Sequence, residues 1–201
     1  AGEFPIHVGG EEIPVHDPRL VPSAATSYKM DATPGRHTQV SAWILELSSG
    51  VPGLCDQPQP QHHYPGKGRV QMRMHNYFHV AQSAGMCNFA TLALAPEILT
   101  DSLTHVTGHT YTLDDVLRTG ARIAALRIAF NLREGMRNIE IPVPGRLIGD
   151  PPLEKGPTAG RTVEVDAQIQ DYLEAMGWDT ETGVPKKPAQ SVWLLDRTGS
   201  A

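Results

Sequence analysis

Cysteine is scarce in this chain. Only Cys55 and Cys87 occur among its 201 residues, too few for the disulfide framework of a small secreted domain. Two thiolates also cannot hold a cubane iron–sulfur cluster by themselves, because such a cluster normally takes four. We therefore expect a reducing, cytoplasmic compartment, and a single Cys55–Cys87 disulfide stays open as the alternative.

Long hydrophobic runs and an excess of basic residues are also absent. No apolar run approaches the ~20 residues that a membrane-spanning helix needs, and the formal net charge is -5 without a dense Lys/Arg stripe. We therefore expect no membrane and no nucleic acid among its partners. The first residues, AGEFPIHVGG, lack an initiator Met and the basic and apolar parts of a signal peptide. This favours a processed chain or an excised piece of a longer one.

Glycine and proline, in contrast, are plentiful, with 19 and 17 residues. They interrupt any regular period in residues 1–40, which we expect to form loop with short extended pieces, and in residues 138–163. Residues 48–69, with QPQPQ near their centre, are predicted to form a long polar loop or an insertion. The short apolar run 40–47, VSAWILEL, fits a strand or a helical turn equally well.

Amphipathic helices are predicted in four segments, residues 70–85, 96–108, 111–135 and 166–177. Thr112 and Asp115 at the start of the third resemble a capping box. Gly120 in its interior is unfavourable by about 1 kcal/mol relative to Ala, which indicates close packing there. Residues 178–196 are expected to form a turn and a short apolar segment. The sequence therefore predicts a mainly α fold, a single multihelical domain over residues 1–201 with long Gly/Pro-rich structured loops.

The stretch QSAGMCNF places Cys87 beside a glycine, just after a predicted helix. A buried, inert thiol is one interpretation, because free cysteine packs like a small hydrophobic residue. A metal or cluster thiolate is the other. If Cys87 binds a cubane cluster, the remaining ligands lie on another domain or another chain.

Histidines occur in two further patterns. His75 and His79 are spaced i, i+4 in a predicted helix, where one face of the helix could bind Zn²⁺ or another divalent ion. The Glu that follows the first His in zinc-protease helices is missing, and two ordinary helix histidines are the alternative. His62 and His63 lie in the polar loop and are expected to be solvated.

The loop DATPGRHTQ carries Asp31, Arg36 and His37. Histidine is the side chain best suited to move protons near neutral pH, and arginine can grip phosphate or carboxylate. An ordinary polar loop held by Asp–backbone contacts is the alternative. The sequence contains no serine nucleophile elbow, P-loop or Rossmann glycine pattern.

Six segments, in this order, resemble the C-terminal part of the tungsten-dependent aldehyde:ferredoxin oxidoreductases. They are EIPVHDPR, YKMDATPGRHTQ, AGMCNF, GARIAALRIAFNLREGM, LEKGPTAGRTVEVDAQIQDYLEAMGWD and TGVPKK. The resemblance covers nearly the whole chain and is weakest in QPQPQHHYPGKG. It implies that the chain is the last domain of a larger oxidoreductase, whose N-terminal cofactor domain is a partner of this one.

The resemblance also implies a cofactor role for the segment that ends in Cys87. In the family, a [4Fe-4S] cluster takes three cysteines from the middle domain and a fourth from the last, at the end of an Asp-x-x-Gly-Leu-Cys motif. The aligned run here is Gln82-Ser83-Ala84-Gly85-Met86-Cys87. Cys87 is then the metal ligand, and the cofactor-binding residues are Gln82, Ser83, Gly85 and Met86.

Two residues refine this expectation. The family Asp that contacts pterin nitrogens is Gln82 here, so one hydrogen bond through its carbonyl oxygen remains, without the strength of a charged acceptor. His37 resembles the family's active-site His, which assists proton transfer near the tungsten.

The implied activity is oxidation of an aldehyde, with water, to a carboxylic acid. A tungsten (or molybdenum) bispterin takes the electrons, and the [4Fe-4S] cluster passes them to ferredoxin or a partner subunit. We expect the isolated chain to be inactive and to retain no cofactor. Two alternatives remain: a non-catalytic helical scaffold or interaction module, in which Gln82 marks lost pterin binding, and a small metal-binding domain based on His75, His79 and Cys87.

Overall fold

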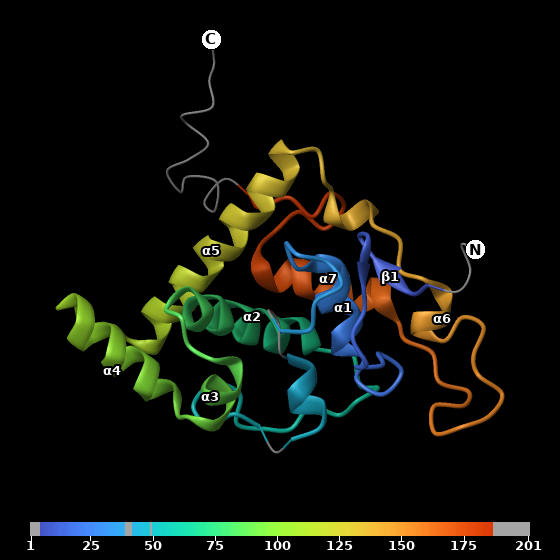
Figure 1. Ribbon diagram of the computed structural model, residues 1–201, viewed down its shortest axis with the longest axis horizontal. Coiled ribbons are helices and arrows are strands. Elements are labelled where there is room, and N and C mark those ends of the chain that lie inside the picture. Colours follow the sequence, from blue (N-terminus) through green and yellow to red (C-terminus); the bar gives the residue numbers. More distant parts are fainter. Residues whose placement is uncertain (1–4, 39–41, 49, 187–201) are drawn as a thin grey trace, which may run out of the picture.

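The computed structural model describes residues 5–38, 42–48 and 50–186, and this part of the chain is mainly α-helical (Figure 1). Its elements, in chain order, are β1 (His7–Val8), β2 (Glu11–Glu12), α1 (Ser23–Met30), the 3-10 helix η1 (Ala42–Glu46), α2 (Lys67–Ser83), α3 (Asn88–Ala93), α4 (Pro96–Thr107), α5 (Leu113–Arg133), the 3-10 helix η2 (Asn138–Glu140), α6 (Gly145–Ile148) and α7 (Val165–Met176). β1 and β2 form a short antiparallel hairpin. The predicted fold class is confirmed.

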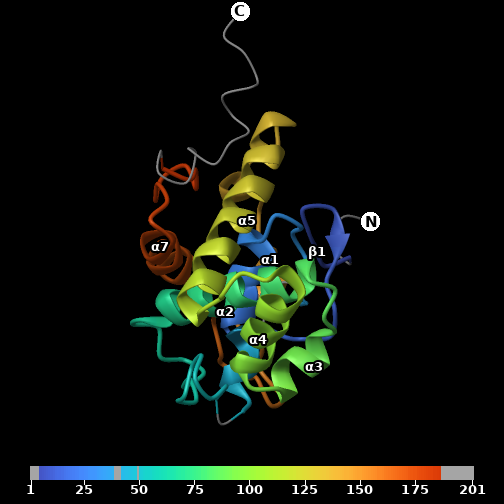
Figure 2. The ribbon, with the colours of Figure 1, turned by 90° about the vertical axis from the view of Figure 1, so that its left-hand side faces the viewer.

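Helix α2 lies in the middle of the molecule and packs mainly against α5 and α7 (Figure 1). At its crossing with α5, a methyl group at Gly120 would lie 1.8 Å from the carbonyl oxygen of Asn76. Only glycine fits there, which confirms the close packing expected at this position. α3 and α4 lie at the side of the molecule that faces the viewer in Figure 2.

Three hydrophobic clusters form the core of the described part of the chain. One fills the space between α1, α5 and α7 and includes Tyr172 and Trp178. A second lies between η1, α2, α4 and the start of α5. A third connects the β hairpin to α1 and α6. Because α2 contributes to the second cluster and packs on α7 as well, most of its length is buried.

The four predicted helices are all present as α2, α4, α5 and α7. α2 begins at Lys67, three residues before the predicted start, and α4 ends against Gly108 in the left-handed conformation (φ 75°). Thr112 and Asp115 form the predicted capping box at the start of α5. Residues 50–66 are loop, in agreement with the prediction for most of 48–69.

The prediction of loop throughout residues 1–40 is wrong for α1. Every residue of α1 except Lys29 is buried, so the helix lacks the exposed face that would give its sequence a 3.6-residue period of polar and apolar residues. The short helices α3, η2 and α6 were also not predicted, because three to six residues carry too little pattern. Run 40–47 contains the helical turn η1, and its first two residues, Val40 and Ser41, lie outside the described residues. The part of the expected C-terminal segment that follows residue 186 also lies outside them.

None of the helices in the described part of the chain has the length and apolar character needed to cross a membrane.

Candidate functional site

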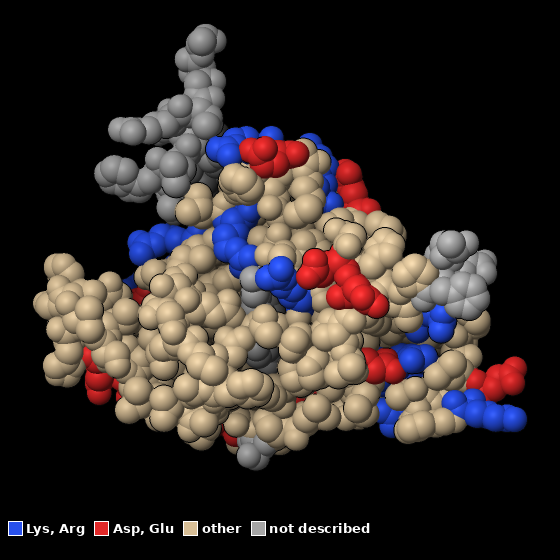
Figure 3. All heavy atoms as spheres, viewed as in Figure 1, with Lys and Arg blue, Asp and Glu red and all other residues tan. Residues whose placement is uncertain are grey.

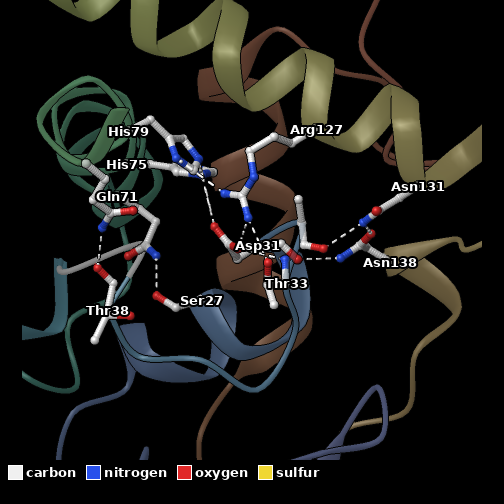
Figure 4. A network of polar contacts seen from close by, with 12 residues as sticks. Ser27, Asp31, Thr33, Thr38, Gln71, His75, His79, Arg127, Asn131 and Asn138 are labelled. Carbon is white, nitrogen blue, oxygen red and sulfur yellow. Dashed lines mark hydrogen bonds and ion pairs between the residues drawn. The ribbon is translucent and has the colours of Figure 1, made fainter. Parts of the chain in front are cut away.

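The loop that follows α1, residues 31–38, is fastened by side chains from α5 and η2 (Figure 4). Asn138 donates to the carbonyl oxygen of Asp31 at 2.6 Å, and Asn131 donates to that of Ala32 at 2.7 Å. The Arg127 guanidinium donates to the Thr33 hydroxyl, also at 2.7 Å. The first half of the loop is therefore held to α5 and η2 by three hydrogen bonds.

The second half of the loop carries His37, which is half-buried. Its ring packs on the ring of His16, with centroids 4.5 Å apart, and its carbonyl oxygen accepts a hydrogen bond from the Trp43 indole at 3.1 Å. Burial lowers the pKa of His37, and His16 lowers it further. His37 is therefore neutral at pH 7, in the form that can accept a proton.

The structure does not bring Asp31, Arg36 and His37 into one site. Asp31 is buried against α2, whereas Arg36 is exposed and lies 3.6 Å from the carboxylate of Glu11. The three residues share a loop but contact different partners: His75, Glu11 and His16.

Gln82, near the end of α2, joins this loop to α3. Its amide nitrogen donates to the Thr38 carbonyl oxygen at 2.6 Å and to the Asn88 side-chain oxygen at 3.2 Å. Asn88 also donates to the Thr38 carbonyl oxygen, at 2.7 Å. Because a carbonyl can only accept, Thr38 fixes which end of the Gln82 amide faces it. The segments of Gln82 and His37, far apart in sequence, are thus side by side.

Both N–H groups of Gln82 are used in these contacts. Its carbonyl oxygen accepts no hydrogen bond from the residues that the structure describes. The residues that follow it, Ser83 and Gly85, are exposed, whereas Met86 is half-buried against the cluster between α2 and α4.

Cys87 precedes α3 and is exposed. The interpretation as a buried thiol is therefore wrong. The disulfide alternative is also wrong, since Cys55 and Cys87 are both free. Cys55 is half-buried, and burial raises the pKa of its thiol, an effect that Arg73 opposes. Of the two thiols, only Cys87 is exposed for contact with another molecule.

A second group of polar side chains is buried in the centre of the molecule (Figure 4). His75 and His79 on α2 meet Asp31, and the side chains of these residues are 0–3% exposed. The two Nε2 atoms of the histidines are 2.5 Å apart, and Asp31 Oδ2 lies 3.4 Å from His75 Nε2 and 3.9 Å from His79 Nε2. The sequence spacing revealed the two histidines, but nothing in the sequence connected them to Asp31.

Two further residues complete this group. The Tyr172 hydroxyl of α7 hydrogen-bonds to His75 Nδ1, and burial raises the pKa of Tyr172 well above its ordinary value, with Asp31 adding to the effect. Arg127 lies 3.6 Å from Asp31 Oδ1 and 3.4 Å from His79 Nδ1. Burial lowers the pKa of His79 far below its ordinary value, and the proximity of His75 and Arg127 lowers it further.

Residues 1–190 match the protein family described as aldehyde ferredoxin oxidoreductase, domains 2 & 3. The chain belongs to this family. It is 25% identical over 193 residues to the tungsten-containing aldehyde ferredoxin oxidoreductase of Pyrococcus horikoshii, an alignment that covers 96% of this chain and 31% of that protein. It is also 26% identical over 186 residues to the protein of the same name from Pyrococcus furiosus, which covers 92% of this chain and 30% of that one.

A third protein of this name, from Thermococcus kodakarensis, is 24% identical over 194 residues, with 96% of this chain and 31% of that protein covered. The chain thus spans about a third of the length of these curated relatives of the aldehyde ferredoxin oxidoreductase family.

Proposed function

We propose that this chain completes the cofactor site of a tungsten (or molybdenum) aldehyde oxidoreductase, together with a cofactor domain that lies outside it. The observation that carries the proposal is the corner formed by Gln82, Cys87 and the loop of His37. Here an exposed thiol, an unused amide oxygen and a neutral histidine lie on adjoining segments. Membership of the aldehyde ferredoxin oxidoreductase family supports it.

Cys87 fits one ligand position of a [4Fe-4S] cluster. Its thiol is exposed and free, as a ligand to a group held mainly by another domain has to be. Because the cluster normally takes four thiolates and Cys55 is half-buried, the other three would come from outside this chain.

Gln82 fits a contact to the pterin. Its two N–H groups hold Thr38 and Asn88, so only its carbonyl oxygen is available, and that oxygen would accept one N–H of a pterin ring. The neutral amide makes a hydrogen bond about half as strong as a carboxylate would. Gln82 would therefore bind the pterin weakly and at the same time hold the loop that carries His37.

His37 is suited to take a proton from the reacting water. The stacked rings of His16 and Trp43 fix its position, and its lowered pKa keeps its imidazole neutral. When bound, the tungsten pterin would take two electrons from the aldehyde, and the cluster would pass them to ferredoxin or a partner subunit. The product would be the carboxylic acid.

Exposed apolar side chains beside this corner favour a partner domain. Phe89, two residues after Cys87, is 84% exposed, and Leu94 and Ile98 on the following segments are 40% and 46% exposed. The same region of the surface carries few charged groups (Figure 3). Apolar side chains gathered in this way are typical of a surface that another domain covers.

The test is to purify the protein together with its cofactor domain from cells grown with tungstate. We expect tungsten and iron in the product and aldehyde-dependent reduction of an electron-accepting dye, with the carboxylic acid formed in proportion. A complex that contains neither metal and does not turn over would instead make this chain a non-catalytic scaffold or interaction module.

A further inference from the structure

Three buried side chains from two separate segments direct ligand atoms at one point. Asp31 Oδ2, His75 Nε2 and His79 Nε2 all lie within 4.8 Å of one another. From this convergence we propose that Asp31, His75 and His79 bind one divalent transition-metal ion, separate from the tungsten and iron of the proposed function. Cys87 is not part of this site, because it is exposed whereas the three ligands are buried.

The contact between the two histidines requires either a hydrogen atom or a metal ion between their Nε2 atoms. Their Nε2 atoms are 2.5 Å apart, so two lone pairs cannot face each other there without a hydrogen or a metal ion between them. Ligand atoms on a tetrahedral zinc ion at about 2.0–2.1 Å lie about 3.3 Å apart. Separating the rings by less than about 1 Å would give this geometry, with the carboxylate oxygen already 3.4 Å from His75 Nε2.

Asp31 supplies the third ligand atom in a form suited to a metal. Its Oδ1 accepts the backbone N–H of Thr33 at 2.8 Å, whereas its Oδ2 is fully buried and accepts no hydrogen bond from the described residues. A buried carboxylate oxygen without a hydrogen bond is unfavourable by roughly 1–3 kcal/mol or more. A metal ion bound by Oδ2 alone would satisfy that oxygen.

The partners of the two Nδ1 atoms decide whether the Nε2 atoms of His75 and His79 can bind a metal ion. His75 Nδ1 hydrogen-bonds with the Tyr172 hydroxyl, which can accept the hydrogen of His75 Nδ1. The lone pair of His75 Nε2 is then directed at the proposed metal position. A metal ion binds only the neutral form of each ring.

The ligand set selects the class of ion. Two imidazole nitrogens and one carboxylate suit zinc and iron(II), whereas calcium and magnesium prefer oxygen ligands. Three protein ligands also leave one coordination position for water or another small ligand.

Arg127 opposes the ion. Its guanidinium lies 3.4 Å from His79 Nδ1 and 3.6 Å from Asp31 Oδ1, so it neutralises the carboxylate and repels a dication. Ligation through His79 Nε2 places a hydrogen on Nδ1, and Arg127 would then have to turn away. Its side chain is 28% exposed and can do so toward solvent. Removing its charge should therefore strengthen metal binding.

The experiment titrates the purified protein, freed of divalent ions by a chelator, with Zn²⁺ by calorimetry and with Co²⁺ by visible absorption. We expect one equivalent to bind, with a Co²⁺ spectrum typical of nitrogen and oxygen ligands. Asp31→Asn and His79→Gln should each weaken Zn²⁺ binding by at least about 100-fold. The matched control, His62→Ala with His63→Ala, removes two exposed histidines and should leave the affinity unchanged.

Loss of Zn²⁺ binding in Asp31→Asn and His79→Gln, with binding retained in the control, supports the site. The absence of one tight equivalent in the wild-type protein, or equal binding in all variants, overturns it. If Asp31→Asn and His79→Gln fail to fold, Arg127→Gln provides the test. Zn²⁺ binding about tenfold tighter than in the wild-type protein supports the proposal, and unchanged or weaker binding contradicts it. Because these titrations use Zn²⁺ and Co²⁺ and need no turnover, their outcome is independent of tungsten, iron and aldehyde oxidation.

Discussion

Helix α2 carries two polar groups with opposite surroundings. In its middle, His75 and His79 are 2% and 3% exposed, and their partners Asp31, Tyr172 and Arg127 all belong to this chain. At its end, Gln82 leads to the exposed Cys87. The side chains of the first group all come from this chain and are buried, whereas the second group has an exposed thiol and an amide oxygen left for another molecule. Burial within one chain therefore distinguishes a site internal to this domain from a site that a second domain has to complete.

The largest effect on the two polar groups of α2 is expected from a substitution that separates α2 from α5. We expect Gly120→Ala to lower the free energy of unfolding by about 3 kcal/mol, because its methyl group would lie 1.8 Å from the Asn76 carbonyl oxygen. Asn76 lies between the two buried histidines in sequence, so we expect the buried group of Asp31, His75 and His79 to be disrupted before the exposed corner. Urea unfolding followed by circular dichroism measures the loss.

The control is Leu126→Ala at a 40% exposed position of the same helix, with an expected change below about 1 kcal/mol. If Gly120→Ala were as stable as wild type or more so, as helix propensity alone predicts, the close crossing would be refuted.

Acid should weaken the buried group more than the exposed corner. The lowered pKa of His79 means that below about pH 6.5 the unfolded chain binds a proton that the folded chain excludes, so stability falls as the pH falls. Between pH 6.5 and 5.0 this contributes about 1.6 kcal/mol. The measurement is urea unfolding at both pH values in the presence of a chelator.

His79→Gln should lack this part of the pH dependence, and His63→Gln, at an exposed position, should keep it. A drop of the same size in wild type and His79→Gln would show that His79 accepts a proton in the folded protein, against the burial argument.

A smaller effect is expected at the exposed corner. Gln82→Glu keeps the shape of the side chain but directs a carboxylate oxygen at the Thr38 carbonyl oxygen, where an N–H now donates at 2.6 Å. We expect a loss of about 1 kcal/mol in unfolding free energy at pH 7, which protonation of the new carboxyl at low pH reverses. Gln57→Glu, at an exposed loop position, controls for the added charge and should change little. Equal stability of the two variants would mean that Gln82 does not hold the His37 loop.

The elements and contacts that the sequence predicted are those that leave a local pattern in it. α2, α4, α5 and α7 have one buried and one exposed face, so their period is readable, and the capping box at Thr112 is a local pattern. α1 is buried almost all round and therefore has no readable period. The spacing of His75 and His79 was local, but Asp31 and Tyr172 reach them from distant segments that only the packing brings together.

The central claim is that the exposed corner supplies one ligand to a cluster held mainly by another domain. The direct test compares iron content and the cluster's optical spectrum in the assembled protein for Cys87→Ala and Cys55→Ala, the chain's two free cysteines. We predict that Cys87→Ala loses most of the cluster iron and all dye reduction while its circular dichroism stays unchanged, and that Cys55→Ala keeps both. An unchanged cluster spectrum in Cys87→Ala would contradict the claim.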